Sequence, residues 1–152
     1  MLRNKKGFTL IEMLVVIAII AVLVSIVIPV VGQSTTRAKA ATDAANMRST
    51  LAALNSEILI EQHLADDYIA SMEPEESKVF PDAKLYVLYT TPGLVDVYYV
   101  HGENYYGLKY FAEIAANGSD SAALASISTQ KPTPSFEHTW YEVGKGEVTE
   151  TP

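Results

Sequence analysis

A single carboxylate, Glu12, lies near the start of an otherwise apolar run, shortly after three basic residues. An ionisable side chain inside a membrane helix costs on the order of 2.5–3.5 kcal/mol on insertion scales, and less near a helix end. Such a carboxylate is a candidate for ion pairing, because a charge in a low-dielectric setting needs a partner of opposite sign. Glu12 is therefore the first candidate functional residue.

The run from Met13 to Val31 is long enough to cross a membrane. Only Ser25 and Pro29 interrupt its apolar side chains. About 20 residues at 1.5 Å each span a hydrocarbon layer of roughly 30 Å. Basic residues beside a membrane segment stay on the cytoplasmic side, and here they precede the run, as Arg3, Lys5 and Lys6. This order predicts that the C-terminal bulk of the chain is exported.

Two simpler membrane roles also fit an apolar N-terminus. A secretory signal peptide has an apolar core of about 7–15 residues followed by a small-residue cleavage site. The run here is longer, and Val30–Gln33 contains no small-x-small pattern. A plain N-terminal anchor fits the hydrophobicity equally well. Neither role accounts for Glu12.

Residues 5–12 read Lys-Lys-Gly-Phe-Thr-Leu-Ile-Glu, and this string resembles the prepilin signature of type IV pilins. The resemblance implies that a membrane peptidase cuts after Gly7, removes residues 1–7 as a leader and methylates the new N-terminus, Phe8. It implies further that the apolar helix is kept, and that Glu12 pairs with the N-terminal amine of a neighbouring subunit.

Cleavage after Gly7 would supply Glu12 with a nearby partner. The new ammonium at Phe8 lies four helical residues earlier, or about 6 Å along the axis. An ion pair in such a setting is not automatically stabilising, but one buried member left unpaired costs about 3–5 kcal/mol. Pairing between subunits would also select the axial register of assembly. The alternative is that Glu12 only caps its own helix, where the macrodipole favours a carboxylate by about 0.3–1 kcal/mol.

Pro29 is the second anomaly of the retained apolar helix, residues 8–31. It lacks an amide hydrogen and its ring collides with the carbonyl of Ser25, which kinks or opens a helix at a cost of about 3 kcal/mol. Neighbouring helices, or Ser25 itself, can satisfy the freed groups. The resemblance implies that the stretch from about Ala21 to Pro29 unwinds in a filament. A kink without functional role is the alternative, and the chain departs from many pilins in having Ala18 and Ala21 where helix-loosening glycines often occur.

Residues 32–60 are predicted to form the amphipathic half of one long helix, from about Phe8 to about Leu59. Apolar side chains recur at spacings of four and three, the period of one helical face. They are Ala40, Ala44, Met47, Leu51, Leu54 and Ile58. Charged residues are expected on the other faces, namely Arg37, Lys39, Asp43 and Arg48. The apolar face should dock on a folded head.

The head, residues 61–152, is predicted to contain a small antiparallel sheet. Residues 61–81 are acidic and contain two prolines, which favours a connecting loop. Strands are expected at 85–89 and 95–100, because both segments are rich in β-branched and aromatic residues. Between them, Pro92-Gly93 fits the two central positions of a type II turn.

The C-terminal part of the head mixes strand and helix signals. Within residues 105–118, the composition favours a short helix over 108–116. A second short helix is expected to be capped by Ser119 or Asp120. Residues 136–143 are predicted to be the last strand, which Gly144-Lys145-Gly146 turns towards a ragged end at Pro152. The fold class is therefore α+β, a long N-terminal helix packed against a small antiparallel sheet in a pilin-like layout.

Composition argues against several function classes. The formal charge is -7, and without the leader 8 basic residues face 18 acidic ones, so direct nucleic-acid binding is not expected. The chain has no cysteine, which excludes disulfide and thiolate chemistry. His63, His101 and His138 are scattered, and no nucleophile motif, phosphate loop or metal-ligand spacing occurs. No enzymatic activity, cofactor or metal is expected.

These patterns predict a structural subunit, the major pilin of a type IV pilus used in adhesion, motility or aggregation. Its expected partners are a prepilin peptidase, an inner-membrane assembly platform and further copies of itself. The chain should cross the membrane once with an exported C-terminus and then enter an extracellular filament. The alternatives are a type II secretion pseudopilin, a competence pilin, and a membrane-anchored binding domain that never polymerises.

Overall fold

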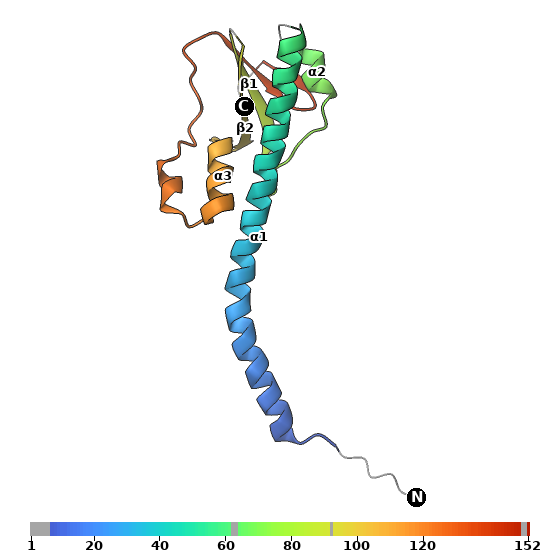
Figure 1. The fold of residues 1–152 in the computed structure, drawn as a ribbon, viewed down its shortest axis with the longest axis vertical. Helices are drawn as coiled ribbons and strands as arrows, with labels where there is room; N and C mark the ends of the chain where they lie inside the picture. Colours follow the sequence, from blue (N-terminus) through green and yellow to red (C-terminus); the bar gives the residue numbers. More distant parts are fainter. Residues whose placement is uncertain (1–6, 62–63, 92, 150–151) are drawn as a thin grey trace, which may run out of the picture. The chain divides into compact units, whose positions relative to one another are not determined.

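In the computed structural model, the described residues are 7–61, 64–91, 93–149 and 152 (Figure 1). The chain divides into two compact units, Met1–Thr35 and Thr36–Pro152, each described below by itself. The predictions for residues 1–6, for His63 and for Pro92 lie outside the described residues.

The first unit consists mainly of the beginning of helix α1, which runs from Leu10 to Glu61. Every described side chain from Gly7 to Thr35 is exposed. A helix that is apolar on all faces needs lipid or other helices around it, because its own unit supplies no surface to cover it. The predicted long helix is confirmed, with both ends within about two residues of the expected positions.

The second unit contains a five-stranded antiparallel sheet and the remainder of α1. The strands are β1 (Lys84–Thr90), β2 (Leu94–His101), β3 (Asn104–Gly107), β4 (His138–Glu142) and β5 (Gly146–Val148). Their order in the sheet is β3-β2-β1-β4-β5, and all pairs are antiparallel. The predicted α+β class and both central strands are thereby confirmed.

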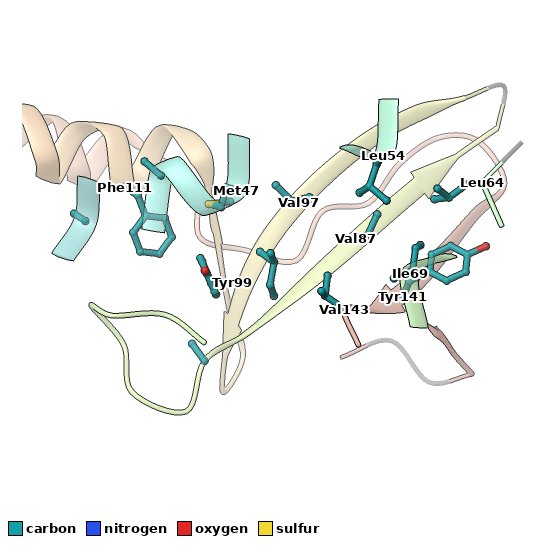
Figure 2. Close-up of a cluster of buried hydrophobic side chains, with 14 of the residues drawn as sticks. Met47, Leu54, Leu64, Ile69, Val87, Val97, Tyr99, Phe111, Tyr141 and Val143 are labelled. Atoms are coloured by element: carbon teal, nitrogen blue, oxygen red, sulfur yellow. The ribbon is translucent and has the colours of Figure 1, made fainter. Parts of the chain in front are cut away.

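The main core lies between α1 and one face of the sheet. Alternation along β1 and β2 directs Val87, Val97 and Tyr99 to this face. Met47 and Leu54 of α1 lie against them, as Figure 2 shows. The small side chains of Ala40 and Ala44 are also buried, and Leu51 and Ile58 pack at the margin. The predicted docking face of the helix is therefore correct.

A second apolar cluster covers the opposite face of the sheet. Leu88, Val100, Tyr105 and Trp140 are all buried there. The ring of Trp140 lies 5.9 Å from that of Tyr98 and 5.6 Å from that of Tyr105. The segment that leads to β4 passes close to this cluster, since the amide of Tyr105 donates to the carbonyl of Thr129 over 2.8 Å. The sheet is thus packed on both faces.

Three short helices complete the head, and two of them correct the sequence predictions. Helix α2 (Asp66–Ser71) lies within the stretch predicted to be loop, because Ile69 buries itself in the main core. Helix α3 (Leu108–Asn117) confirms the predicted helix, directly after β3. The 3-10 helix η1 (Ala122–Ser126) is capped by the hydroxyl of Ser121, which accepts from the amide of Ala123, so both predicted caps are wrong.

Two turns also differ from expectation. The amide of Gly93 donates to the carbonyl of Thr90 over 2.8 Å, which makes Gly93 the fourth residue of the turn and not a central one. The turn at residues 144–146 closes a hairpin with a further strand, β5, where no strand was predicted; residues 150–151 lie outside the described residues. Gly144 and Gly146 permit this hairpin with φ values of 85° and 93°, which other residues rarely adopt. The amide of Gly144 donates to the carbonyl of Ile69, so the hairpin is tied to α2.

Asp43 is the clearest error of the sequence analysis in the head. It was expected on an exposed face of α1, but it is fully buried. Its carboxylate accepts from the hydroxyl of Ser77 over 2.6 Å, from the amide of Lys78 over 2.7 Å and from the amide of Val79 over 3.0 Å. Asp43 therefore anchors the loop before β1 to the helix.

Candidate functional site

The N-terminus of α1 is closed by a reciprocal pair of side chains, Thr9 and Glu12. The amide and the hydroxyl of Thr9 both donate to Oε2 of Glu12 over 2.8 Å, and the amide of Glu12 donates to Oγ1 of Thr9 over 3.3 Å. Since α1 begins at Leu10, Thr9 is the N-cap and Glu12 the third helical residue, which is a capping box. The carboxylate thus accepts from donors that the first turn leaves without intrahelical partners.

Gly7 and Phe8 lie immediately before this capped turn, outside the helix. The side chain of Phe8 is 81% exposed. A Cβ placed on Gly7 would meet no atom within 4 Å, and Gly7 is not among the glycines with positive φ. Neither packing nor backbone conformation therefore explains why this position is a glycine.

Pro29 lies inside α1, and the helix continues through it without interruption. The hydroxyl of Ser25 donates to the carbonyl of Val22 over 2.7 Å. This hydroxyl therefore bonds one turn further back and does not replace the hydrogen bond that Pro29 cannot give to the carbonyl of Ser25. At 1.5 Å per residue, Pro29 is about 26 Å along the axis from Glu12, so the two form separate sites.

The segment that contains these residues is long and apolar enough to cross a membrane. Its most apolar window of 18 residues has a mean hydropathy of 3.4, and none of that window is buried. A family model described as the prokaryotic N-terminal methylation motif matches residues 2–28. The chain carries a type IV pilin-like prepilin signature. Neither a curated protein nor a solved structure matches the chain.

The prepilin signature has general consequences for the chain. It implies processing by a prepilin peptidase, methylation, and pilus assembly in a broad sense. Together with the apolar helix it indicates membrane anchoring. The motif is typical of structural, non-enzymatic proteins, which include both pilins and pseudopilins.

The residues that the sequence analysis singled out around the signature glycine lie close together along the chain. Gly7, Phe8, Thr9 and Glu12 lie within two turns of one another at the start of α1. Thr9 received no role in the sequence analysis, although Thr-x-x-Glu before an apolar run is the sequence pattern of a capping box. Capping by Glu12 is observed directly, whereas pairing of Glu12 between subunits stays a prediction.

Outside the signature, the buried carboxylate of Glu142 in the head binds two exposed lysines. Nζ of Lys84 and Nζ of Lys145 lie 3.3 Å and 2.7 Å from Oε1 of Glu142. The hydroxyl of Tyr86 donates to the other carboxylate oxygen over 3.2 Å. Burial by itself would raise the pKa of Glu142, but the two lysines outweigh burial and hold this pKa below its ordinary value. The cluster joins strands β1 and β4 with the turn before β5.

The two described histidines do not form a metal site. His101 stacks on Phe80 at the end of β2, and His138 lies exposed at the start of β4. Within residues 7–61, 64–91 and 93–149, no cluster of three or more His, Asp or Glu side chains could hold a metal ion. The chemistry that the described residues support best is therefore that of the N-terminal segment.

Proposed function

We propose that the chain is the major pilin of a type IV pilus, a structural subunit that assembles through its N-terminal helix into an extracellular filament. The observation that carries this proposal is the combination of an exposed apolar first half of α1 with one carboxylate in its first turn, shortly after the signature glycine. The filament would serve adhesion, surface motility or aggregation.

The exposed apolar helix requires two successive environments. Its backbone groups are satisfied internally, so a bilayer can hold it as a single-pass segment with the head exported. Outside the membrane, only contacts with other apolar helices remove the same side chains from water. Copies of the same helix supply such contacts, so the proposal places α1 in the filament core and the heads around it. The assembly platform of the inner membrane would drive this transfer.

The segment around Gly7 and Phe8 is the proposed substrate of the prepilin peptidase. Hydrolysis of the peptide bond between them adds one water and leaves a carboxylate on Gly7 and an ammonium on Phe8. Because nothing in the structure requires glycine at position 7, recognition by the peptidase is a sufficient reason for it. The new amine of Phe8 is then the group that becomes methylated.

Glu12 is proposed to pair with the Phe8 ammonium of a neighbouring subunit. The capping box orients its carboxylate toward the N-terminal end of α1, the end at which cleavage creates the positive charge. A carboxylate has about four lone-pair sites, so Thr9 and a neighbouring ammonium can bind it together. Pro29 is proposed to allow local opening of the helix during packing, with the carbonyl of Ser25 as the group that needs a new partner.

The processing step is tested by mass spectrometry of the N-terminus after co-expression with a prepilin peptidase. The expected product begins at Phe8 and carries one methyl group on its amine. A Gly7→Val variant serves as the control and should stay uncut, since the added side chain has room in the structure and would affect only the peptidase. An extracellular product that begins at any other residue would contradict the proposal.

The assembly role of Glu12 is tested by comparing Glu12→Ala with Thr9→Ala in cells that make filaments. Both variants remove the capping box, which alone costs about 0.5–2 kcal/mol, but only Glu12→Ala removes the carboxylate. We expect both proteins to be cut and inserted, with a large loss of filament yield for Glu12→Ala alone. Equal yields from the two variants would mean that Glu12 only caps its helix.

Electron microscopy of sheared surface material separates the proposal from its alternatives. Long fibres that contain this chain support a major pilin. Short fibres confined to the cell envelope would indicate a pseudopilin or a competence pilin. No fibres in cells that process the chain would indicate a membrane-anchored domain.

A further inference from the structure

A cleft of about 320 Å³ opens beside strand β2, at the point where β3 ends. Strand β3 has four residues and pairs only with Tyr98–His101 of the eight-residue strand β2. Directly after Gly107 the chain continues as helix α3, so no described strand pairs with Leu94–Val97 on this side. The shortness of β3 therefore creates this opening, called here the β2 cleft.

The lining of the β2 cleft is mainly apolar. Its aliphatic side chains are Leu51 of α1, Val97 of β2, Leu108 of α3 and Ile127 after η1. They come from separate parts of the chain, so the cleft exists only in the folded head. Its volume is at the lower end for ligand pockets, which measure roughly 300–1,000 Å³, and is suited to one small ligand.

Two tyrosines, Tyr98 of β2 and Tyr110 of α3, also line the β2 cleft. Both are half-buried, and neither hydroxyl forms a hydrogen bond with another described residue. Burial, with a smaller effect from the charge of Asp96, raises the pKa of Tyr98, and burial also raises the pKa of Tyr110. Both hydroxyls therefore stay protonated at neutral pH and can donate or accept hydrogen bonds.

Gly107 leaves one of these rings accessible. Its φ of -78° is allowed for every residue, so backbone conformation does not require a glycine there. A Cβ at this position would lie 3.4 Å from Cε1 of Tyr98, and a larger side chain would crowd that ring. The glycine therefore keeps the ring of Tyr98 open to a ligand.

Groups of opposite charge lie at the same cleft. The carboxylate of Asp96 accepts hydrogen bonds and the ammonium of Lys109 donates them, and both residues are exposed. Within the described part of the chain, the two form no ion pair with each other, and neither side chain makes a hydrogen bond. Ser128 adds a hydroxyl, which accepts from the amide of Gln130 over 3.3 Å and can still donate. The cleft thus offers both donors and acceptors around an apolar lining.

These properties favour a sugar over other classes of ligand. An apolar ligand would cover Asp96 and Lys109 without pairing with them, which is costly. A phosphate group would bring negative charge close to Asp96, in a chain whose formal charge is already -7. A pyranose ring has apolar C–H groups that pack on an aromatic ring. Each of its hydroxyls can donate and accept at once, so it can satisfy the carboxylate and the ammonium together.

We infer that the β2 cleft binds one pyranose ring of a neutral carbohydrate. The apolar side of the sugar packs on Tyr98, and its hydroxyls bind Asp96 and Lys109. This inference rests on the proposed function, in which the filament serves adhesion, and it gives adhesion a class of ligand and a place on the head.

Two-dimensional NMR of the isotope-labelled full chain tests the inference. The chain is held in dodecylphosphocholine micelles, because this detergent has no sugar headgroup that could compete. The probes are the methyl β-glycosides of glucose, galactose and N-acetylglucosamine, added one at a time. At least one probe should shift the amide signals of residues 96–98 and 107–110 as its concentration rises. Unchanged signals at these residues with all three probes overturn the inference.

Three variants test whether the binding site is the β2 cleft. Asp96→Ala should weaken binding by about tenfold or more, because a hydrogen bond to a charged group is lost. Gly107→Leu should abolish binding, because the new side chain crowds Tyr98. The matched control is Asp120→Ala, which removes an exposed carboxylate that does not line the cleft, and it should bind like the unaltered chain. The same spectra show whether each variant is folded, and equal affinities of folded Asp96→Ala and Asp120→Ala overturn the site.

The outcomes separate this inference from the proposed function, since binding is measured without filaments. Filaments from a chain whose amide signals no probe shifts overturn the sugar site alone. The expected shifts in a chain that forms no filaments in cells support the sugar site and overturn the proposed function.

Discussion

Replacing Asp43 with alanine should destabilise the head strongly, although Asp43 has no proposed role in processing or in pairing between subunits. The carboxylate is fully buried in α1 and accepts hydrogen bonds from the hydroxyl of Ser77 and from the amides of Lys78 and Val79. Alanine removes the common acceptor and leaves these three donors without it. The variant therefore tests whether one side chain attaches the loop before β1 to the long helix.

The expected magnitude follows from this geometry. Each buried donor left without a partner costs about 1–3 kcal/mol. Lys78 is exposed, so water can partly replace the hydrogen bond that its amide loses. We therefore expect Asp43→Ala to lower the free energy of unfolding by about 3–5 kcal/mol. At about 4 °C per kcal/mol for a head of this size, Tm should fall by roughly 12–20 °C.

The assay uses the only tryptophan of the chain. Trp140 lies in the head and is 2% exposed, so its fluorescence reports unfolding of the head while α1 is held in a detergent micelle. Urea titrations of the full chain give the free energy of unfolding. The matched control is Thr42→Ala, the preceding residue, which is exposed and whose hydroxyl bonds only within the helix, to the carbonyl of Ala38. If the free energy of unfolding of Asp43→Ala lies within about 0.5 kcal/mol of that of the control, the reasoning is refuted, because ordinary surface substitutions change the free energy by that amount.

Two further predictions concern the hairpin formed by β4 and β5. The pKa of Glu142 is lower in the folded chain than its unfolded value of about 4.3. The ion pairs of Glu142 therefore stabilise the folded head fully above about pH 4.3. This stabilisation is lost as the pH falls through the pKa of Glu142 in the folded chain. Urea titrations at stepped pH should show this acid-dependent loss, and Glu142→Gln should abolish it; an unchanged pH profile would contradict the assignment. Gly146→Ala should destabilise the head by more than about 1–3 kcal/mol, the cost of backbone strain alone, because its Cβ would lie 2.5 Å from Oδ1 of Asp66. Gly93→Ala is the control, because Gly93 has a φ of 118°, also outside the left-handed region that alanine adopts, but open space around it. Equal losses in the two variants would rule out the contact.

The N-terminal third could be predicted from sequence because its determinants are local. An apolar run of sufficient length and a capping pattern of Thr9 and Glu12 depend on neighbours along the helix. The docking face of α1 was also predictable, since a period of 3.6 residues places Met47 and Leu54 on one side. The structure confirms the long helix and its docking face.

Asp43 shows where this reasoning failed. It lies three residues after Ala40 and four before Met47, which is the spacing of the buried face, so its position could have identified it. Its charge argued for exposure instead. An aspartate can be buried only when donors from elsewhere satisfy it, and the donors around Ser77 are more than thirty residues away in sequence.

The short elements β5 and α2 were not predicted for the same reason. Strand β5 is three residues long and carries no strong pattern of its own, and it forms because β4 lies beside it. Helix α2 is six residues long, too short to be stable alone, and it exists because Ile69 reaches the core. Short elements of this kind depend on tertiary contacts, which local propensity does not contain.

By itself, the amino-acid sequence determined the membrane helix, its signature and the face that α1 turns toward the head, because each follows from composition and spacing along one helix. Only the tertiary structure decided that Asp43 is buried, that β5 pairs with β4 as a fifth strand, and that the segment before β4 lies beside the end of β1. These features join residues distant in sequence, and such contacts become favourable only after the chain has folded around them.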